Sequence, residues 1–95
     1  MKTLTVSKPA WQALSDARSF APPFVGELLD EAYESRGGFR QITYEDDQRD
    51  EVLGLIQFVV TEEWEIARRE AVKYGDGVEA VAYYIYELDA ILNRM

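Results

Sequence analysis

The side chains of this sequence that could do chemistry are almost all carboxylates. The 95 residues include 18 Asp and Glu and 10 Lys and Arg, with neither histidine nor cysteine. Without imidazole or thiol there is no Ser-His-Asp or Cys-His nucleophile, and no ring-nitrogen or thiolate ligand for a metal. Acid–base catalysis near neutral pH would need a carboxylate, lysine or tyrosine with a strongly shifted pKa. We therefore expect a protein that is not an enzyme and that carries no cofactor.

The densest group of carboxylates lies just before the longest predicted helix. It comprises Glu45, Asp46, Asp47, Asp50 and Glu51. Such oxygens suit Ca²⁺ or Mg²⁺, but the group lacks the alternating ligands and the glycine of a calcium-binding loop. Acids at this position also compensate the helix dipole. We expect no metal here, and two interpretations stay open: a solvated helix cap or a contact with a partner.

Charge is distributed unevenly along the chain. Residues 1–43 hold five acids and five bases, whereas residues 44–95 hold thirteen acids and five bases, so the whole net charge of −8 belongs to the second half. Proteins that bind nucleic acids directly, or anionic membranes, show the opposite sign. The asymmetry favours a basic protein partner, or else it serves solubility alone.

A second candidate contact surface lies on the last predicted helix, where tyrosines accompany carboxylates. Its residues are Glu79, Tyr83, Tyr86 and Glu87. Because Ile85 belongs to the apolar face of this helix, we expect these residues mainly on the opposite side. Exposed tyrosines are common at protein interfaces. They could bind a partner, form a homodimer, or simply cover the edge of a small core.

The elements that must position these residues follow from periodicity and from capping residues. Two strands are predicted at 2–6 and 39–44, and four helices at about 8–18, 23–36, 46–74 and 77–94. Two short strands are not stable alone, so we expect them to pair with each other and to lie on the helices. The fold class is therefore α+β, mostly helical, with four helices and a two-stranded β element.

The last two helices are expected to form an antiparallel hairpin. Gly75 is a typical helix end, and Asp76 with Glu79 resembles a capping box that starts the next helix. The apolar seam of the last helix would be Val78, Val81, Ile85, Leu88 and Leu92. Gly54, inside the preceding helix, suggests that another element approaches closely there.

Length and composition indicate one compact domain, residues 1–95. The longest uninterrupted run of large apolar residues, Phe58 to Val60, is far too short to cross a membrane. The first residues alternate polar and apolar types and so lack a signal-peptide core. Together with the absence of cysteine, these features make the cytoplasm the expected location.

One family resemblance involves about a quarter of the chain. The opening segment 1–7, followed by a predicted helix and then by Glu27-Leu28-Leu29-Asp30-Glu31-Ala32, resembles the N-terminal arm of Phd/YefM-type antitoxins. The segment from Phe20 to Val25 departs from the family pattern because it interrupts the helix. The acidic helix start after Gly38 also departs from it, so no residue roles carry over.

These observations lead to a functional expectation. We expect a small acidic, non-catalytic interaction module that binds and masks a basic protein surface, in the manner of an antitoxin, an immunity protein or a phage inhibitor. One alternative is a structural homodimer or scaffold whose charge only maintains solubility. The other is a small enzyme that uses a shifted carboxylate.

Overall fold

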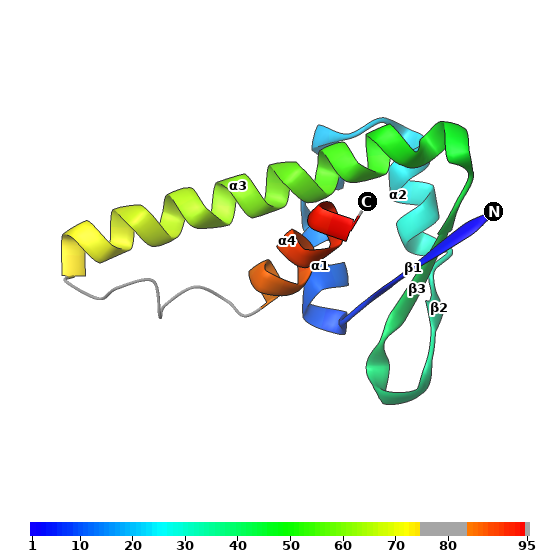
Figure 1. Ribbon diagram of the computed structural model, residues 1–95, viewed down its shortest axis with the longest axis horizontal. Coiled ribbons are helices and arrows are strands. Elements are labelled where there is room, and N and C mark those ends of the chain that lie inside the picture. The colour runs from blue at the N-terminus through cyan, green and yellow to red at the C-terminus, as the bar shows by residue number, and fades with distance from the viewer. Residues whose placement is uncertain (75–83, 95) are drawn as a thin grey trace.

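The computed structural model describes residues 1–74 and 84–94, apart from the side chains of residues 67 and 70–74. Its helices and strands are β1 (Lys2–Val6), α1 (Lys8–Asp16), α2 (Pro23–Asp30), β2 (Tyr33–Glu34), β3 (Arg40–Tyr44), α3 (Arg49–Tyr74) and α4 (Tyr84–Arg94) (Figure 1). Three 3₁₀ turns, η1 (Arg18–Phe20), η2 (Arg36–Gly38) and η3 (Asp46–Gln48), connect them. The described residues thus form a mostly helical α+β fold with four helices, as the sequence predicts.

The sheet is antiparallel and has the strand order β1-β3-β2. The predicted pairing of β1 with β3 is confirmed, with Leu4 opposite Ile42 and both side chains buried. The prediction of only two strands is wrong, since Tyr33 and Glu34 add β2 along the other edge of β3. The turn from β2 to β3 uses Gly37, whose φ of +85° is favourable only for glycine.

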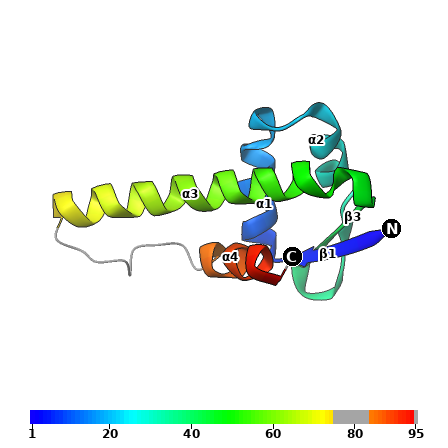
Figure 2. The same cartoon turned by 45° about the horizontal axis from the view of Figure 1, so that its top comes forward.

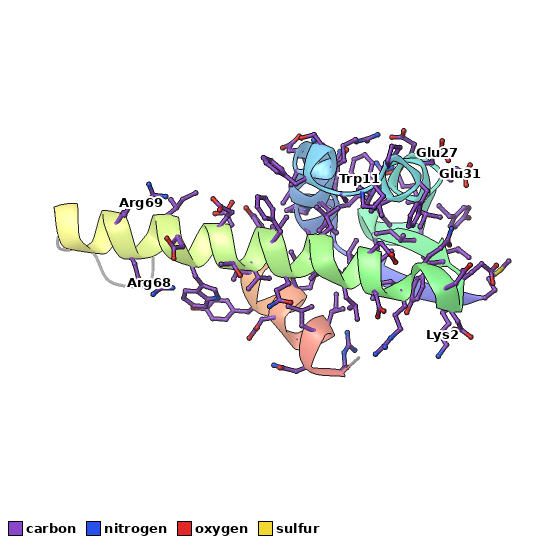
Figure 3. All side chains as sticks on the ribbon, turned by 90° about the horizontal axis from the view of Figure 1, so that it is seen from above. Lys2, Trp11, Glu27, Glu31, Arg68 and Arg69 are labelled. Atoms are coloured by element: carbon purple, nitrogen blue, oxygen red, sulfur yellow. The ribbon has the colours of Figure 1, made fainter. Side chains whose placement is uncertain are left out.

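The second helix ends at Asp30, so the predicted span of 23–36 is too long. The indole Nε1 of Trp11 (Figure 3) donates a hydrogen bond of 2.9 Å to the carbonyl oxygen of Leu29 in the last turn of the helix, and this oxygen also accepts from the N–H of Ala32 at 3.3 Å. Beyond Leu29 only the small side chain of Ala32 packs against the core before Tyr33, which is 67% exposed. Pairing with β3 therefore satisfies the backbone better than another helical turn.

The first half of α3 contributes more buried residues to the core than any other element does. Its buried residues are Val52, Leu55, Ile56, Val59 and Val60. Beyond these residues α3 extends past the rest of the fold, and the side chain of Ile66 there is 39% exposed (Figures 1 and 2). Helix α3 is described as far as Tyr74, where the described segment stops, so its predicted end at about this residue stays a prediction. No helix among the described residues has a stretch both long and apolar enough to cross a membrane.

The last helix returns along the first half of α3 in the opposite direction (Figure 2). Its buried residues are Ile85, Leu88 and Ile91, whereas Leu92 is only partly buried. The predicted seam therefore misplaces its last position by one residue. Its first two positions, and the predicted connection at 75–77, lie outside the described residues.

Helix α4 is also bound to the start of α1. The two carboxylate oxygens of Glu87 accept hydrogen bonds from the backbone N–H of Ser7, at 2.7 Å, and from its hydroxyl, at 2.6 Å. Ser7 caps α1, because its hydroxyl oxygen accepts from the N–H of Ala10. In a capping box the acid at the Ala10 position would bind the cap N–H; here Glu87 does so from 80 residues away. The expectation that Glu87 lies on an outer, non-packing side of the helix is therefore wrong.

The expected close approach at Gly54 is also wrong. A Cβ added to Gly54 would meet no heavy atom within 4 Å. We predict that Gly54→Ala raises the free energy of unfolding by about 0.5–1 kcal/mol, because it removes the entropic cost of glycine in a helix. Gly26→Ala is the contrast, since its Cβ would lie 3.3 Å from Cδ of Arg18. Chemical denaturation should show a smaller gain, or a loss, at Gly26. Equal gains at both sites would contradict this prediction.

Removing the Glu87 carboxylate should leave two donors of Ser7 without an acceptor. We predict that Glu87→Ala lowers the free energy of unfolding by about 1–3 kcal/mol. Asp89→Ala is the matched control, because Asp89 is an exposed acid two residues further along α4, and its loss should cost less than about 0.5 kcal/mol. Urea denaturation of both variants measures the difference, and equal costs would show that the Ser7–Glu87 contact contributes nothing.

Candidate functional site

The acidic cluster predicted from the sequence lies at η3 and at the start of α3. Glu45 and Gln48 form a capping box: the backbone N–H of Glu45 donates to Oε1 of Gln48 at 2.9 Å, and the Gln48 N–H donates to the Glu45 side chain. Asp46, Asp47 and Asp50 are exposed, whereas Glu51 is half-buried. Among the described residues, no three acidic side chains gather closely enough to hold a metal ion.

The second predicted surface is only partly described, since Glu79 and Tyr83 lie outside the described residues. Tyr86 is 54% exposed, and its ring meets Trp64 edge-on with centroids 5.8 Å apart. Asp50 and Trp64 are fourteen residues apart on α3, which corresponds to about 21 Å along a helix. The structure therefore does not bring the two predicted surfaces together.

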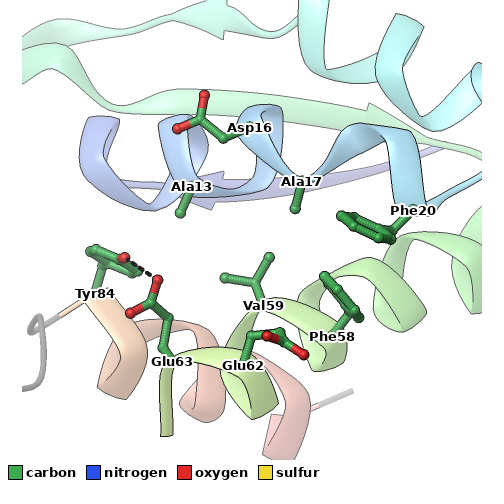
Figure 4. Close-up of a pocket in the computed structure, with 9 residues that line it drawn as sticks. All are labelled: Ala13, Asp16, Ala17, Phe20, Phe58, Val59, Glu62, Glu63 and Tyr84. Carbon is green, nitrogen blue, oxygen red and sulfur yellow. Dashed lines mark hydrogen bonds between the residues drawn. The ribbon is translucent and has the colours of Figure 1, made fainter. Parts of the chain in front are cut away.

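A groove that sequence reasoning did not select opens between α1 and α3, and the first residue of α4 lines one end of it (Figure 4). Its volume is about 480 Å³. The lining residues are Ala13, Asp16, Ala17, Phe20, Phe58, Val59, Glu62, Glu63 and Tyr84. Helical spacing explains the set, because residues three and four apart share a face of a helix. Small alanines on α1 leave the space that the groove occupies.

One wall of the groove is aromatic. Phe20 lies in η1, directly after α1, and its ring stacks on Phe58 of α3 with centroids 4.5 Å apart and planes 27° apart. Phe58 is half-buried against the core, whereas Phe20 is 71% exposed. Pro22 and Pro23 follow η1 and begin a new helix, so the chain turns away at this point. A large apolar ring is thus held at the surface.

The remaining polar lining is acidic. Asp16 projects from α1, and Glu62 and Glu63 project from α3 (Figure 4). The Tyr84 hydroxyl donates a hydrogen bond of 3.1 Å to Oε1 of Glu63. Burial raises the pKa of Tyr84 to about 12, with further contributions from the Glu63 hydrogen bond and from the negative charges of Glu63 and Asp16. None of the residues that the structure places around the groove is cationic.

Only one sequence signal pointed towards this groove. Phe58 and Val59 are followed one helical turn later by Glu62 and Glu63, so an apolar face becomes acidic along the same side of α3. The contribution of α1 has no such signal, because Asp16 meets these residues only through the packing of α1 on α3. The groove is therefore a product of tertiary structure.

Comparison of the chain with protein-family models, with curated proteins and with solved structures found no match in any of the three. The chemistry of the groove is therefore argued from its own residues. The face of an aromatic ring attracts cations, and carboxylates accept strong, charge-assisted hydrogen bonds from guanidinium and ammonium groups. A stacked phenylalanine pair beside three carboxylates is suited to hold an organic cation.

The raised pKa of Tyr84 predicts a specific dependence of stability on pH. Its folded-state pKa of about 12 exceeds the ordinary value of 10.0, so the folded state holds the phenol proton more tightly than the unfolded state does. Its contribution is present below pH 10 and is lost as the pH rises towards 12. Tyr84→Phe should weaken the fall in unfolding free energy across this window.

Absorbance of tyrosinate after a pH jump provides the matching spectroscopic readout. Among the six tyrosines, the ionisation step near pH 12 should disappear in Tyr84→Phe and persist in Tyr86→Phe, which alters an exposed ring. If the ionisation step disappears in Tyr86→Phe and persists in Tyr84→Phe, its assignment to Tyr84 is contradicted.

Proposed function

We propose that this protein is a non-catalytic interaction module that binds and masks a basic surface of another protein. In this proposal the groove between α1 and α3 receives a cationic side chain of the partner. The observation that carries the proposal is the composition of the groove: the stacked rings of Phe20 and Phe58 lie beside Asp16, Glu62 and Glu63, with no cation among the lining residues.

Arginine fits this lining better than lysine. A guanidinium group is planar, stacks on aromatic faces and offers a fork of donors that matches a carboxylate. Phe20 supplies an exposed ring face, and Asp16 and Glu62 supply exposed carboxylates from opposite sides of the groove. The ammonium group of lysine is a compact, strongly hydrated point charge, so it gains less from the aromatic wall.

The rings and the charges have different roles in the proposed complex. Burying a phenylalanine side chain contributes about 1.5–3 kcal/mol, and Phe20, which is 71% exposed, has most of that burial still to gain. Carboxylates at the surface instead guide the partner during approach and speed association. Phe20 should therefore control mainly how long a complex lasts, and the acids how quickly it forms.

The rest of the molecule extends the electrostatic part of the proposal. The net charge is −8, and Asp46, Asp47 and Asp50 add exposed carboxylates at the other end of α3. Because these acids lie away from the groove, their role in the proposal is long-range attraction rather than direct contact. Such attraction weakens as salt shortens the range of the field.

Binding kinetics with a captured basic partner test this function. We predict that Phe20→Ala speeds dissociation by about ten- to a hundredfold, the equivalent of losing 1.5–3 kcal/mol of burial. Asp16→Asn combined with Glu62→Gln should slow association and reduce its dependence on salt. Asp46→Asn combined with Asp47→Asn is the matched control: it removes the same charge far from the groove and should leave dissociation unchanged.

Two results would refute the proposal. A dissociation rate that does not change in Phe20→Ala, or that rises as much in the Asp46 and Asp47 control as in Phe20→Ala, would show that the groove is not the contact. A stable dimer with no partner recovered would instead favour the structural homodimer. The exposed Tyr86, in contact with Trp64, and the exposed Ile66 are the residues on which such a dimer would depend.

A further inference from the structure

A second groove, of opposite charge, lies at the other end of the fold. It has a volume of about 560 Å³ and is lined by Lys2, Tyr44, Asp46, Arg49 and Arg94. These residues come from the start of β1, the end of β3, the η3–α3 junction and the last turn of α4. An adjoining groove of about 400 Å³ shares Tyr44 and Arg94 with it. We call the two together the basic groove.

The charge of the basic groove is exceptional in this chain. Three cations and one carboxylate line its larger part, whereas the whole chain carries a net charge of −8. Lys2 and Arg94 are exposed, and within the described part of the chain neither side chain has an ion pair or hydrogen bond. Two exposed cations that have no ion pair among the described residues therefore line one groove, which Arg49 also lines.

We propose that the basic groove binds the phosphate group of a small phosphate monoester. Guanidinium forks bind phosphate oxygens in pairs, and an ammonium group adds a point charge. Arg94 supplies an exposed fork and Lys2 the ammonium group, and Arg49 lines the same groove. Above a pH of about 6 a phosphate monoester approaches two negative charges. Lys2 and Arg94, two exposed cations of the groove, are the charges that such a group would meet.

The adjoining part of the groove has room for the group that carries the phosphate. Thr3 and Thr5 line it with hydroxyl groups, which can donate to or accept from polar atoms of a ligand. Leu4 and Ile91 contribute an apolar floor and are themselves buried in the core. This combination suits a small polar molecule lying against β1.

This proposal is independent of the protein partner proposed above. The acidic groove involves residues 58–63 of α3, whereas Arg49 stands at the first residue of that helix. The charged residues that line the two grooves also differ: they are carboxylates in the groove between α1 and α3 and mainly cations in the basic groove. Either proposal can therefore fail without the other.

Titration of the full chain with glycerol phosphate, followed through backbone amide signals at low salt, tests the proposal. Saturable shifts are expected at the start of β1, at η3 and in the last turn of α4. Lys2→Gln and Arg94→Gln should each weaken the affinity by about tenfold, or 1.4 kcal/mol. Lowering the pH from about 7 to 5 should also weaken binding, because the phosphate group loses a charge.

Arg68→Gln is the matched control, because Arg68 is an exposed arginine on the projecting part of α3, far from Lys2 (Figure 3). It removes the same charge and should leave the affinity unchanged. Shifts that never saturate, or an equal loss in Arg68→Gln, would overturn the proposal. Binding of citrate as tight as that of glycerol phosphate would overturn the choice of phosphate in favour of a carboxylate ligand.

Discussion

The burial of one apolar stripe on the first half of α3 is the interaction on which the rest of the structure depends. Ile56 and Val59 are almost fully enclosed, and helices α1 and α4 pack around this part of α3 (Figure 2). A domain of this size gains its stability mainly from such burial, so the stripe fixes where the other elements lie. Because the stripe stops near Val60, the remaining turns of α3 extend beyond the core, and the acidic groove lies where the stripe ends.

Two carboxylates hold α4 against helices α1 and α3. Glu87 binds Ser7 at the start of α1, and Glu63 accepts a hydrogen bond from Tyr84. The first contact uses a helix cap that α1 needs in any case. The second places the Tyr84 ring at the end of the acidic groove. Glu63 thus has a structural role as well as a place in the groove, whereas Asp16 and Glu62 are exposed there.

The two grooves differ in the sign of most of the charges that line them. A strong net negative charge alone would attract any cation, which gives speed but little selectivity. Aromatic rings in the acidic groove add a geometric requirement, because a partner side chain must stack as well as carry charge. In the basic groove Lys2 and Arg94 are cations among the lining residues of an otherwise acidic chain. Selectivity in both proposals comes from these local arrangements, and the overall charge affects mainly the rate of encounter.

Local sequence patterns determined the class of the fold and the strands that form β1 and β3, because periodicity acts over a few residues. Tertiary packing decided the rest. Nothing near Glu87 in the sequence indicates that it binds Ser7, and nothing near Asp16 indicates that it lines the same groove as Glu62. The sequence around Gly54 likewise does not tell whether another element lies beside it, and in the structure none does. Which apolar faces meet, and which polar groups they bring along, depends on contacts between residues far apart in the chain, and these form only when the core closes.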